Sequence, residues 1–427
     1  MKTKEPPSMP SSPDQNEPNQ APGAKLSASA LPPPIRDNQH GRAGPIPTQV
    51  GGTQPAAEVP RGRFGILLRM GSMAEWLFGA VSMIVILAVL ATLPIVQILS
   101  LGYLLEVCGR VARSGRLRDG FIGIRKASRV GCIVLCTWLL LLPVRLVSSL
   151  WRDARLIDPD SAATQNLQIA LYVLTALIVG HILWAWFRGG LLRHFLWPAP
   201  IRFIKRVTQG SLYAEARDAV WDFVRGLRLR YYFWLGLRGF VGALAWLVLP
   251  ISLLAVAMTL PSPANGLIGL LGGLMLATVL LYLPFMQTRF AAEGRFAAMF
   301  ERREARRLFG RAPIAFWFAL VITLVFALPL YLLKIELTPQ EVAWLPSLVF
   351  VVFIFPARLL TGWAVGRAMQ REQPRHFVFR WAARLAAVPV VGMYALIVFF
   401  TQYLLWYGPY SMYEQHVFMV PVPFLGG

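Results

Sequence analysis

Residues 76–105 read WLFGAVSMIVILAVLATLPIVQILSLGYLL, thirty residues in a row without a charged side chain. A helix of about 20 apolar residues crosses the hydrocarbon of a bilayer, because each residue adds about 1.5 Å. As one straight helix this stretch would be about 45 Å long. Pro94 lies inside it, and a proline there interrupts the helical hydrogen bonds. The stretch predicts a membrane segment with a break.

Two readings of this first segment remain open. In one, residues 76–105 form a Pro-broken re-entrant hairpin with both ends on the cytoplasmic side, because the eleven residues after Pro94 are too few for a full crossing. In the other, the segment is a single tilted span, and the chain before it lies outside. Basic residues on both flanks favour the hairpin.

Seven further apolar stretches of similar length follow along the chain. They are residues 131–150, 167–187, 233–260, 266–288, 314–333, 346–366 and 385–408. Hydrophobic residues make up 56% of the chain and charged residues 15%, which is more apolar surface than one soluble core can bury. We therefore predict an all-α fold, a polytopic transmembrane helical bundle with about seven or eight membrane segments.

Lysine and arginine alternate between abundance and near absence in the connecting segments. Residues 106–129, 188–232, 289–313 and 367–384 contain 28 of them, whereas residues 151–166, 261–265, 334–345 and 409–427 contain 3. Cytoplasmic connections of membrane proteins carry the excess of these residues. The pattern predicts a multi-pass protein of the cell inner membrane, with arginine-rich connections in the cytoplasm and a non-cytoplasmic C-terminus.

The two ends of the chain differ in composition from the apolar region between them. The first sixty residues contain thirteen prolines and no aromatic residue, so they lack the apolar area that would offset ordering of the chain. We predict a disordered, Pro-rich cytoplasmic tail at residues 1–62, a transmembrane helical domain at residues 63–408 and a short non-cytoplasmic tail at residues 409–427.

Two of the arginine-rich connections contain amphipathic patterns. In residues 211–230 the apolar side chains recur at spacings of three and four, and residues 289–309 are similar, with Glu304 placed to pair with Arg307. Amphipathic helices of this kind lie in the head-group plane, with arginines reaching lipid phosphate. The alternative is that both segments simply continue the spanning helices into the cytosol.

Arg145 and Arg358 each occur in a Pro-x-Arg-Leu sequence within an apolar stretch. An arginine inside hydrocarbon costs about 2.5–3.5 kcal/mol on insertion scales, so it needs a carboxylate, a free carbonyl or a short route to the interface. Arg145 lies six residues from Trp151 and can reach the outer interface. For Arg358 we expect an ion pair with Glu293 or Glu106; the functional alternative is contact with a substrate anion or lipid phosphate.

The other intramembrane polar candidates lie singly in different stretches. Gln97 and Gln287 each follow a proline by three residues, and Glu106 lies one helical turn before Arg110, with which it can pair. A transport site draws on several polar groups that converge near the midplane. These scattered positions do not by themselves predict transport.

The sequence predicts no metal site, no cofactor and no catalytic residue. The five histidines lie in five different segments, and no Gly-x-Ser-x-Gly elbow, P-loop or dinucleotide fingerprint is present. Cys132 and Cys136, with Cys108, form either a small packing surface or a soft-metal site of three thiolates. Two GxxxG pairs are expected to be contacts between helices, Gly269 with Gly273 and Gly362 with Gly366.

Two stretches resemble sequences of a known group of proteins. They are LGYLLEVCGRVARSGRLRDG at residues 101–120 and RFAAEGRFAAMF at residues 289–300. They look like short signatures in a class of uncharacterised bacterial integral membrane domains, distantly similar to the membrane region of glycerophosphodiester phosphodiesterases. The resemblance implies an all-helical membrane domain. The soluble hydrolase domain of true phosphodiesterases, with its metal site, is not found in this chain, so no functional residue is carried over.

Three functional hypotheses follow from these patterns. The first is a non-catalytic integral membrane protein that acts in membrane organisation, lipid contact or partner assembly, and whose partner is the bilayer with its anionic head groups. The second is a secondary transporter or channel-like protein, which requires a polar cavity near Arg358 and Gln287. The third is a membrane-embedded lipid-processing enzyme, which requires Glu106, Glu293 and His194 to meet at the interface. Nucleic acid is not an expected partner, because the basic residues flank apolar stretches.

Overall fold

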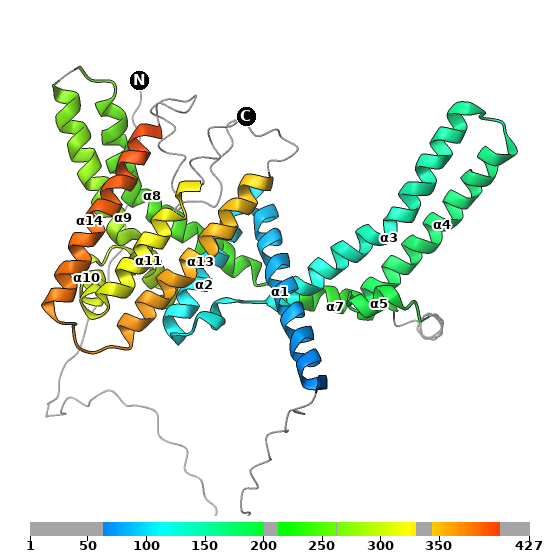
Figure 1. Cartoon of the computed structure of the whole chain (residues 1–427), viewed down its shortest axis with the longest axis horizontal. Coiled ribbons are helices and arrows are strands. Elements are labelled where there is room, and N and C mark those ends of the chain that lie inside the picture. Colours follow the sequence, from blue (N-terminus) through cyan, green and yellow to red (C-terminus); the bar gives the residue numbers. More distant parts are fainter. Residues whose placement is uncertain (1–62, 200–211, 262, 330–343, 402–427) are drawn as a thin grey trace, which may run out of the picture. The chain divides into compact units, whose positions relative to one another are not determined.

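A computed structural model of the chain describes residues 63–199, 212–261, 263–329 and 344–401. Every regular element in these ranges is a helix, so the predicted all-α fold is confirmed (Figure 1). All of them belong to the second of two compact units, Pro60–Gly427. The predicted tails, residues 1–62 and 409–427, lie outside the described residues.

Seven helices of the described ranges are long and apolar enough to cross a membrane. They comprise α1 (Arg63–Thr92), α3 (Ile124–Ile157), α4 (Ala162–Phe187), α8 (Leu229–Ala257), α9 (Ala264–Glu293), α13 (Trp344–Met369) and α14 (Phe377–Thr401). An eighth crossing is obtained only if α10 (Arg302–Arg311) and α11 (Pro313–Val325) are taken together, although they are bent by 112° at Ala312. The predicted number of membrane segments is confirmed.

The first apolar stretch is two helices and not one. α1 ends at Thr92, two residues before Pro94, and α2 (Gln97–Ser114) begins three residues after the proline. Ile95 between them has a φ of +69°, a left-handed conformation that a helix does not contain. The predicted break is therefore confirmed, and a single continuous tilted helix is excluded.

α2 runs back alongside α1 as the second limb of a hairpin. The Ser100 hydroxyl donates a hydrogen bond to the Leu87 carbonyl at 3.0 Å, and about one turn away the Tyr103 hydroxyl lies 2.7 Å from Sδ of Met83. Residue numbers rise along α2 as they fall along α1, so the two limbs are antiparallel. The hairpin thus returns the chain towards the end of the bundle at which α1 begins.

α2 is the central helix of the bundle, with α1, α8, α9 and α13 packed around it. Most of its residues are buried, from Gln97 near one end to Ala112 near the other. Glycines make the close approach possible: a Cβ at Gly102 would overlap the Tyr232 carbonyl oxygen of α8, and a Cβ at Gly109 would come within 2.6 Å of the Ala291 backbone of α9. Small residues of this kind let helix backbones meet inside a membrane.

One of the two predicted GxxxG pairs is a helix contact. Gly362 and Gly366 of α13 face α2, where added Cβ atoms would lie 2.5 Å from the Cys108 carbonyl oxygen and 2.8 Å from that of Ala112. The prediction for Gly269 and Gly273 holds only for Gly269, where a Cβ would touch Ala257 of α8 at 3.6 Å; a Cβ at Gly273 would meet none of the described residues within 4 Å.

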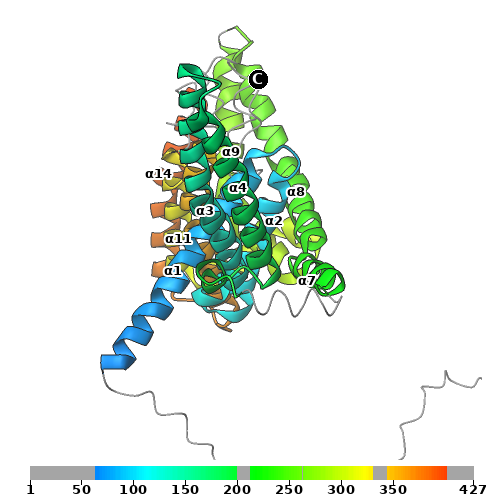
Figure 2. The ribbon, with the colours of Figure 1, turned by 90° about the vertical axis from the view of Figure 1, so that its right-hand side faces the viewer.

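α3 and α4 form a second hairpin, and they lie side by side in Figure 2. Ser161 caps α4, since its Oγ accepts a hydrogen bond from the Thr164 backbone N–H, and this fixes the turn that follows Asp158. In the most apolar 18 residues of each helix, only 6% of α3 and 17% of α4 is buried within the protein. Both helices therefore present apolar side chains outward over most of their length, as lipid-facing helices do.

The two predicted amphipathic segments have different outcomes. Residues 211–230 contain α7 (Leu212–Gly226), which leads into α8 after Arg228, a residue with a φ of +51°. Residues 289–309 are not one helix, because α9 ends at Gly294 in the left-handed conformation and a short 3-10 helix, η2 (Phe296–Met299), precedes α10. The expected Glu304–Arg307 ion pair on α10 is confirmed.

Candidate functional site

Three of the arginine-rich connections, residues 106–129, 289–313 and 367–384, meet at one end of the bundle. The end of α2 meets the end of α9, because Arg113 donates to the carbonyls of Ala291 at 2.9 Å and Ala292 at 3.2 Å. The segment after α13 meets α10 in the same way, through a 2.9 Å bond from the Arg375 N–H to the Gly310 carbonyl. Helices that are far apart in sequence thus present their basic ends together.

Glu106 is held at this end by two partners from different helices. The Arg113 guanidinium donates to one carboxylate oxygen at 2.8 Å, and the Tyr231 hydroxyl of α8 donates to the other at 2.7 Å. The expected pair of Glu106 with Arg110 is not formed; Arg113, two turns along α2, takes its place. Glu106 therefore links α2 to α8, while Arg113 links α2 to α9.

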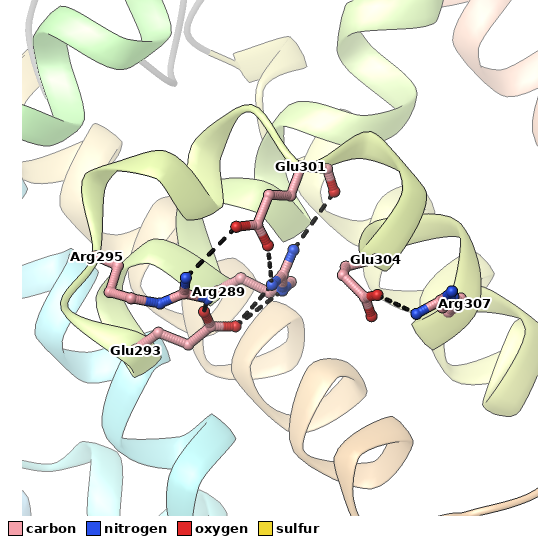
Figure 3. A network of polar contacts seen from close by, with 6 residues as sticks. All are labelled: Arg289, Glu293, Arg295, Glu301, Glu304 and Arg307. Carbon is pink, nitrogen blue, oxygen red and sulfur yellow. Dashed lines mark hydrogen bonds and ion pairs between the residues drawn. The ribbon is translucent and has the colours of Figure 1, made fainter. Parts of the chain in front are cut away.

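Arg289 is the centre of a second network, at the last turn of α9 (Figure 3). Its side chain is only 4% exposed, and it donates to the Glu293 carboxylate at 2.8 and 3.1 Å and to the Glu301 carboxylate at 2.8 Å. Arg295 closes the ring with ion pairs of 2.5 Å to Glu293 and 3.6 Å to Glu301. The network joins α9, η2 and the start of α10.

Gly294 explains why this ring can close. Its φ of +73° turns the chain at the end of α9, and its N–H donates to the Phe290 carbonyl at 2.8 Å. The turn carries Arg295 back towards Glu293 and brings Glu301 to Arg289. Hydrogen bonding to the Arg289 guanidinium, aided by the positive charges of Arg289 and Arg295, lowers the pKa of Glu301 despite its partial burial.

α10 turns four arginines outward from the same end of the bundle. Ala305 and Leu308 are buried on its inner side, and the opposite side exposes a group that we call the α10 arginine face. This face consists of Arg302, Arg303, Arg306 and Arg307. Two of these side chains lie over aromatic rings, Arg302 over Trp246 at 4.8 Å and Arg306 over Tyr282 at 5.8 Å from the ring centroids.

Arg358 and Gln287, both candidates from the sequence, meet in the core. Nη1 of Arg358 on α13 donates to Oε1 of Gln287 on α9 at 2.8 Å, and the two side chains are 2% and 0% exposed. Arg358 lies eight residues before Gly366, which is about 12 Å along the helix from the arginine-rich end. The pair is therefore a polar contact inside a membrane-spanning part of the bundle.

The expected ion pair of Arg358 with Glu293 or Glu106 is wrong. Both carboxylates are taken by other arginines, Glu293 by Arg289 and Glu106 by Arg113. Within the described part of the chain, Nε and Nη2 of Arg358 are buried and have no hydrogen-bond partner. A guanidinium with two unpaired nitrogens is unusual in a protein interior, where polar groups are almost always paired.

The remaining sequence candidates are not brought to this pair. Arg145 is exposed on α3 in the second hairpin, and Gln97 is buried at the first turn of α2. That Arg145 reaches the outer interface stays a prediction. His194 lies in the short helix α5 (Leu192–Leu196), where burial and the neighbouring Arg188 and Arg193 lower its pKa. Among the described residues, no hydrogen bond joins His194 to Glu106 or Glu293.

The three cysteines are divided between two parts of the protein. Cys108 lies in the main core on α2, whereas Cys132 and Cys136 of α3 lie in a separate small cluster with Sγ atoms 3.9 Å apart. The alternative of a three-thiolate metal site is therefore wrong. No group of three or more His, Cys, Asp or Glu side chains with metal-binding geometry occurs in the residues that the structure describes.

Comparison with known proteins adds no relative to this description. No protein-family model, no curated protein and no solved structure matches the chain. The resemblance to the membrane region of glycerophosphodiester phosphodiesterases thus stays a prediction. The two stretches that carry it are in contact, because Arg113 of the first donates to Ala291 of the second.

Sequence reasoning missed three residues of these networks. Arg289 lies at the end of an apolar stretch, where it indicates topology, and Glu293 four residues later is an i, i+4 pairing signal that could have identified the ion pair. Arg113 and Tyr231 gave no such signal, because their partners lie on other helices or two turns away. Contacts of this kind depend on helix packing that periodicity does not report.

Proposed function

We propose that this chain is a non-catalytic integral membrane protein whose arginine-rich end binds the anionic head groups of one leaflet. The observation that carries the proposal is the α10 arginine face, whose four exposed arginines lie on the side of the helix opposite its buried apolar residues. Guanidinium groups bind phosphate bidentately, and basic residues near an anionic surface each contribute about 1 kcal/mol of attraction.

Aromatic contacts support head-group depth for this face. Arg302 and Arg306 lie over Trp246 and Tyr282, and on α13 Arg367 lies over Trp363 at 5.4 Å. Trp and Tyr are enriched where the hydrocarbon meets the head groups, and arginine side chains extend from that level to phosphate. The arginines of α10 and α13 are therefore proposed to lie in the same interfacial layer.

The proposed membrane is the cell inner membrane, with the arginine-rich end in the cytoplasm. Lys and Arg accumulate in cytoplasmic connections, and the cytoplasmic leaflet carries a negative surface potential. In this orientation the connections after α3 and α8 lie on the opposite side. The C-terminus is then non-cytoplasmic, as the alternation of charge predicts.

The two alternatives receive less support. The transporter hypothesis requires a cavity lined by polar groups near Arg358 and Gln287. The buried residues beside Arg358 on α13 are apolar, and they include Phe355, Ala357 and Leu359. The enzyme hypothesis asked for Glu106, Glu293 and His194 together, and the two glutamates are instead engaged by arginines. Transport and lipid processing remain hypotheses that these contacts do not favour.

Replacing the α10 arginine face with glutamine is expected to reduce selectivity for anionic lipid. In liposomes, spin-labelled phosphatidylglycerol should be enriched over phosphatidylcholine around the native protein. The fourfold variant should lose about half or more of that preference at low salt, because each arginine attracts the anionic surface. Electron paramagnetic resonance of the two spin-labelled lipids measures the relative association constant directly.

Arg152 and Arg155 provide the matched control for this experiment. They are exposed arginines near the other end of α3, and Arg155 lies over Trp151 at 5.4 Å, so they share the chemistry of the α10 face but not its location. Arg152→Gln with Arg155→Gln should leave the selectivity nearly unchanged. An equal loss in both variants would show that net charge alone attracts the lipid, and the proposed site would be rejected.

A further inference from the structure

Inside the bundle, two N–H donors of the Arg358 guanidinium have no hydrogen-bond partner among the described residues. Its Nη1 is used by Gln287, and the two nitrogens without a partner in the described residues are Nε and Nη2. Nε and Nη2 lie along one edge of the planar guanidinium, and their N–H groups point in nearly parallel directions. This edge matches the two oxygens of a carboxylate or phosphate.

The guanidinium is held in place by its surroundings. Gln287 accepts a hydrogen bond from Nη1 at 2.8 Å and thereby fixes that end of the guanidinium. The side chain is 2% exposed, so its charge is almost completely removed from solvent. A positioned donor pair in an apolar interior binds a matching acceptor more strongly than the same pair in water.

No carboxylate of the described residues neutralises this charge. Glu106 and Glu293, which the sequence offered as partners, are both engaged by other arginines, and Gln287 is neutral. Buried charges in proteins are paired with an opposite charge or bind a ligand, because leaving them unpaired is costly. The pairing that completes Arg358 must therefore supply a negative charge and at least two acceptor atoms.

We propose that Arg358 binds an oxyanion through Nε and Nη2, with Gln287 orienting the guanidinium from the opposite edge. The ligand is a carboxylate or a phosphate group, supplied either by a small free anion or by the phosphate of a membrane lipid. This inference concerns the interior of the bundle and does not depend on the lipid contact proposed for the α10 arginine face.

The arginine-rich end raises the local concentration of such a ligand close to Arg358. Arg358 lies about 12 Å along α13 from Gly366, and Arg367 follows directly at the basic end. Clusters of one sign of charge raise the local concentration of the opposite ion. Anions collected at this end are therefore close to the buried fork.

The first arm of the test measures free anions. The whole protein in neutral detergent is titrated with inorganic phosphate or acetate at constant ionic strength, and the midpoint of thermal unfolding is recorded. A ligand that binds the folded state raises this midpoint saturably. Arg358→Lys keeps the charge but lacks the fork, so its half-saturating concentration should be at least about tenfold higher.

The second arm measures lipid. The native protein and Arg358→Lys are purified from the same membranes, and native mass spectrometry counts the phospholipids that each retains. If lipid phosphate is the ligand, the native protein should keep one phosphatidylglycerol that the lysine variant loses. The phosphate and acetate titrations should then have little effect on either protein.

Gln287→Glu is a second variant, which keeps the proposal testable if Arg358→Lys does not fold. A carboxylate at this position would accept from Nη1 and neutralise Arg358 from within, so the unfolding midpoint without added anion should rise. The same variant should bind the oxyanion at least about tenfold more weakly, because the fork no longer carries an unbalanced charge. Stability and binding are thereby expected to change in opposite directions.

The outcomes separate the proposal from its rejection. Arg358-dependent stabilisation by phosphate or acetate supports a free oxyanion, and Arg358-dependent retention of phospholipid supports a lipid. If neither arm differs between the native protein and Arg358→Lys, or if Gln287→Glu destabilises the protein without changing any binding, Arg358 is not an oxyanion site.

Discussion

Gly102→Ala is expected to cause the largest loss of stability among the glycine-to-alanine changes in α2. A Cβ at this position would overlap the backbone carbonyl of Tyr232, and a Cβ at the facing Gly236 of α8 would come within 2.0 Å of the Ile98 carbonyl oxygen. Backbone atoms cannot rotate away as side chains do, so α2 and α8 must separate. We expect a cost of about 3 kcal/mol or more, at the upper end of overpacking effects.

The measurement is the unfolding midpoint of the purified protein in detergent, with Gly273→Ala as the control. Gly273 lies in α9, and a Cβ there would meet nothing within 4 Å. That substitution should leave the midpoint unchanged or slightly raised, because alanine favours a helix over glycine. If Gly102→Ala were as well tolerated as Gly273→Ala, α2 would not be the tightly packed centre of the bundle.

Arg289→Gln is expected to destabilise the arginine-rich end by about 2–3 kcal/mol. The substitution removes the buried one of the two guanidinium charges that Glu293 and Glu301 share, and leaves both carboxylates with only the exposed Arg295. Losing one partner of a fully buried pair costs about 3–5 kcal/mol, and the smaller value here reflects carboxylates that are 20% and 33% exposed. The measurement is again the unfolding midpoint, supported by hydrogen exchange of η2 and α10.

Arg307→Gln is the matched control for this prediction. Arg307 also pairs with a glutamate, Glu304, but its side chain is 71% exposed and belongs to the solvent-facing side of α10. An exposed pair contributes at most about 1 kcal/mol. Equal effects of the two substitutions, or faster exchange in Arg307→Gln than in Arg289→Gln, would contradict the structural role given to the buried network.

The membrane segments could be predicted because a bilayer imposes a length on them. About 20 apolar residues are needed to cross, and each predicted stretch in the described ranges contains helix. Residues 314–333 differ from the predicted single helix. There α11 has only 13 residues and reaches the length of a membrane span only together with α10, across a sharp bend. Hydropathy reports length and composition, and the bend at Ala312 depends on packing.

The helix ends were less predictable although their signals were present. The apolar spacing continues through residues 289–309 and by itself predicts one amphipathic helix there. Gly294 ends α9 in a left-handed conformation, as Gly115 with a φ of +71° ends α2. Glycine after a helical run is the usual terminating residue, and this signal outweighs periodicity where the two disagree.

The Arg358–Gln287 pair marks the limit of what sequence alone gives for the site. Each residue was a candidate because it is polar within an apolar stretch. Their contact was not predicted, because the two lie 71 residues apart and the register between α9 and α13 is fixed by packing. The expected ion pairs failed for the same reason, since the glutamates are held by arginines at the helix ends.

The central claim is that the arginine-rich end of the bundle faces the cytoplasmic leaflet, and labelling of single cysteines tests it most directly. In a chain whose native cysteines are replaced by alanine, Asp160→Cys lies in the α3–α4 turn and Arg303→Cys on the exposed side of α10. A membrane-impermeant thiol reagent applied to intact cells should label the first, and should label the second only after the inner membrane is opened. Labelling of Arg303→Cys in intact cells, with Asp160→Cys protected, would contradict the proposed orientation and lipid contact.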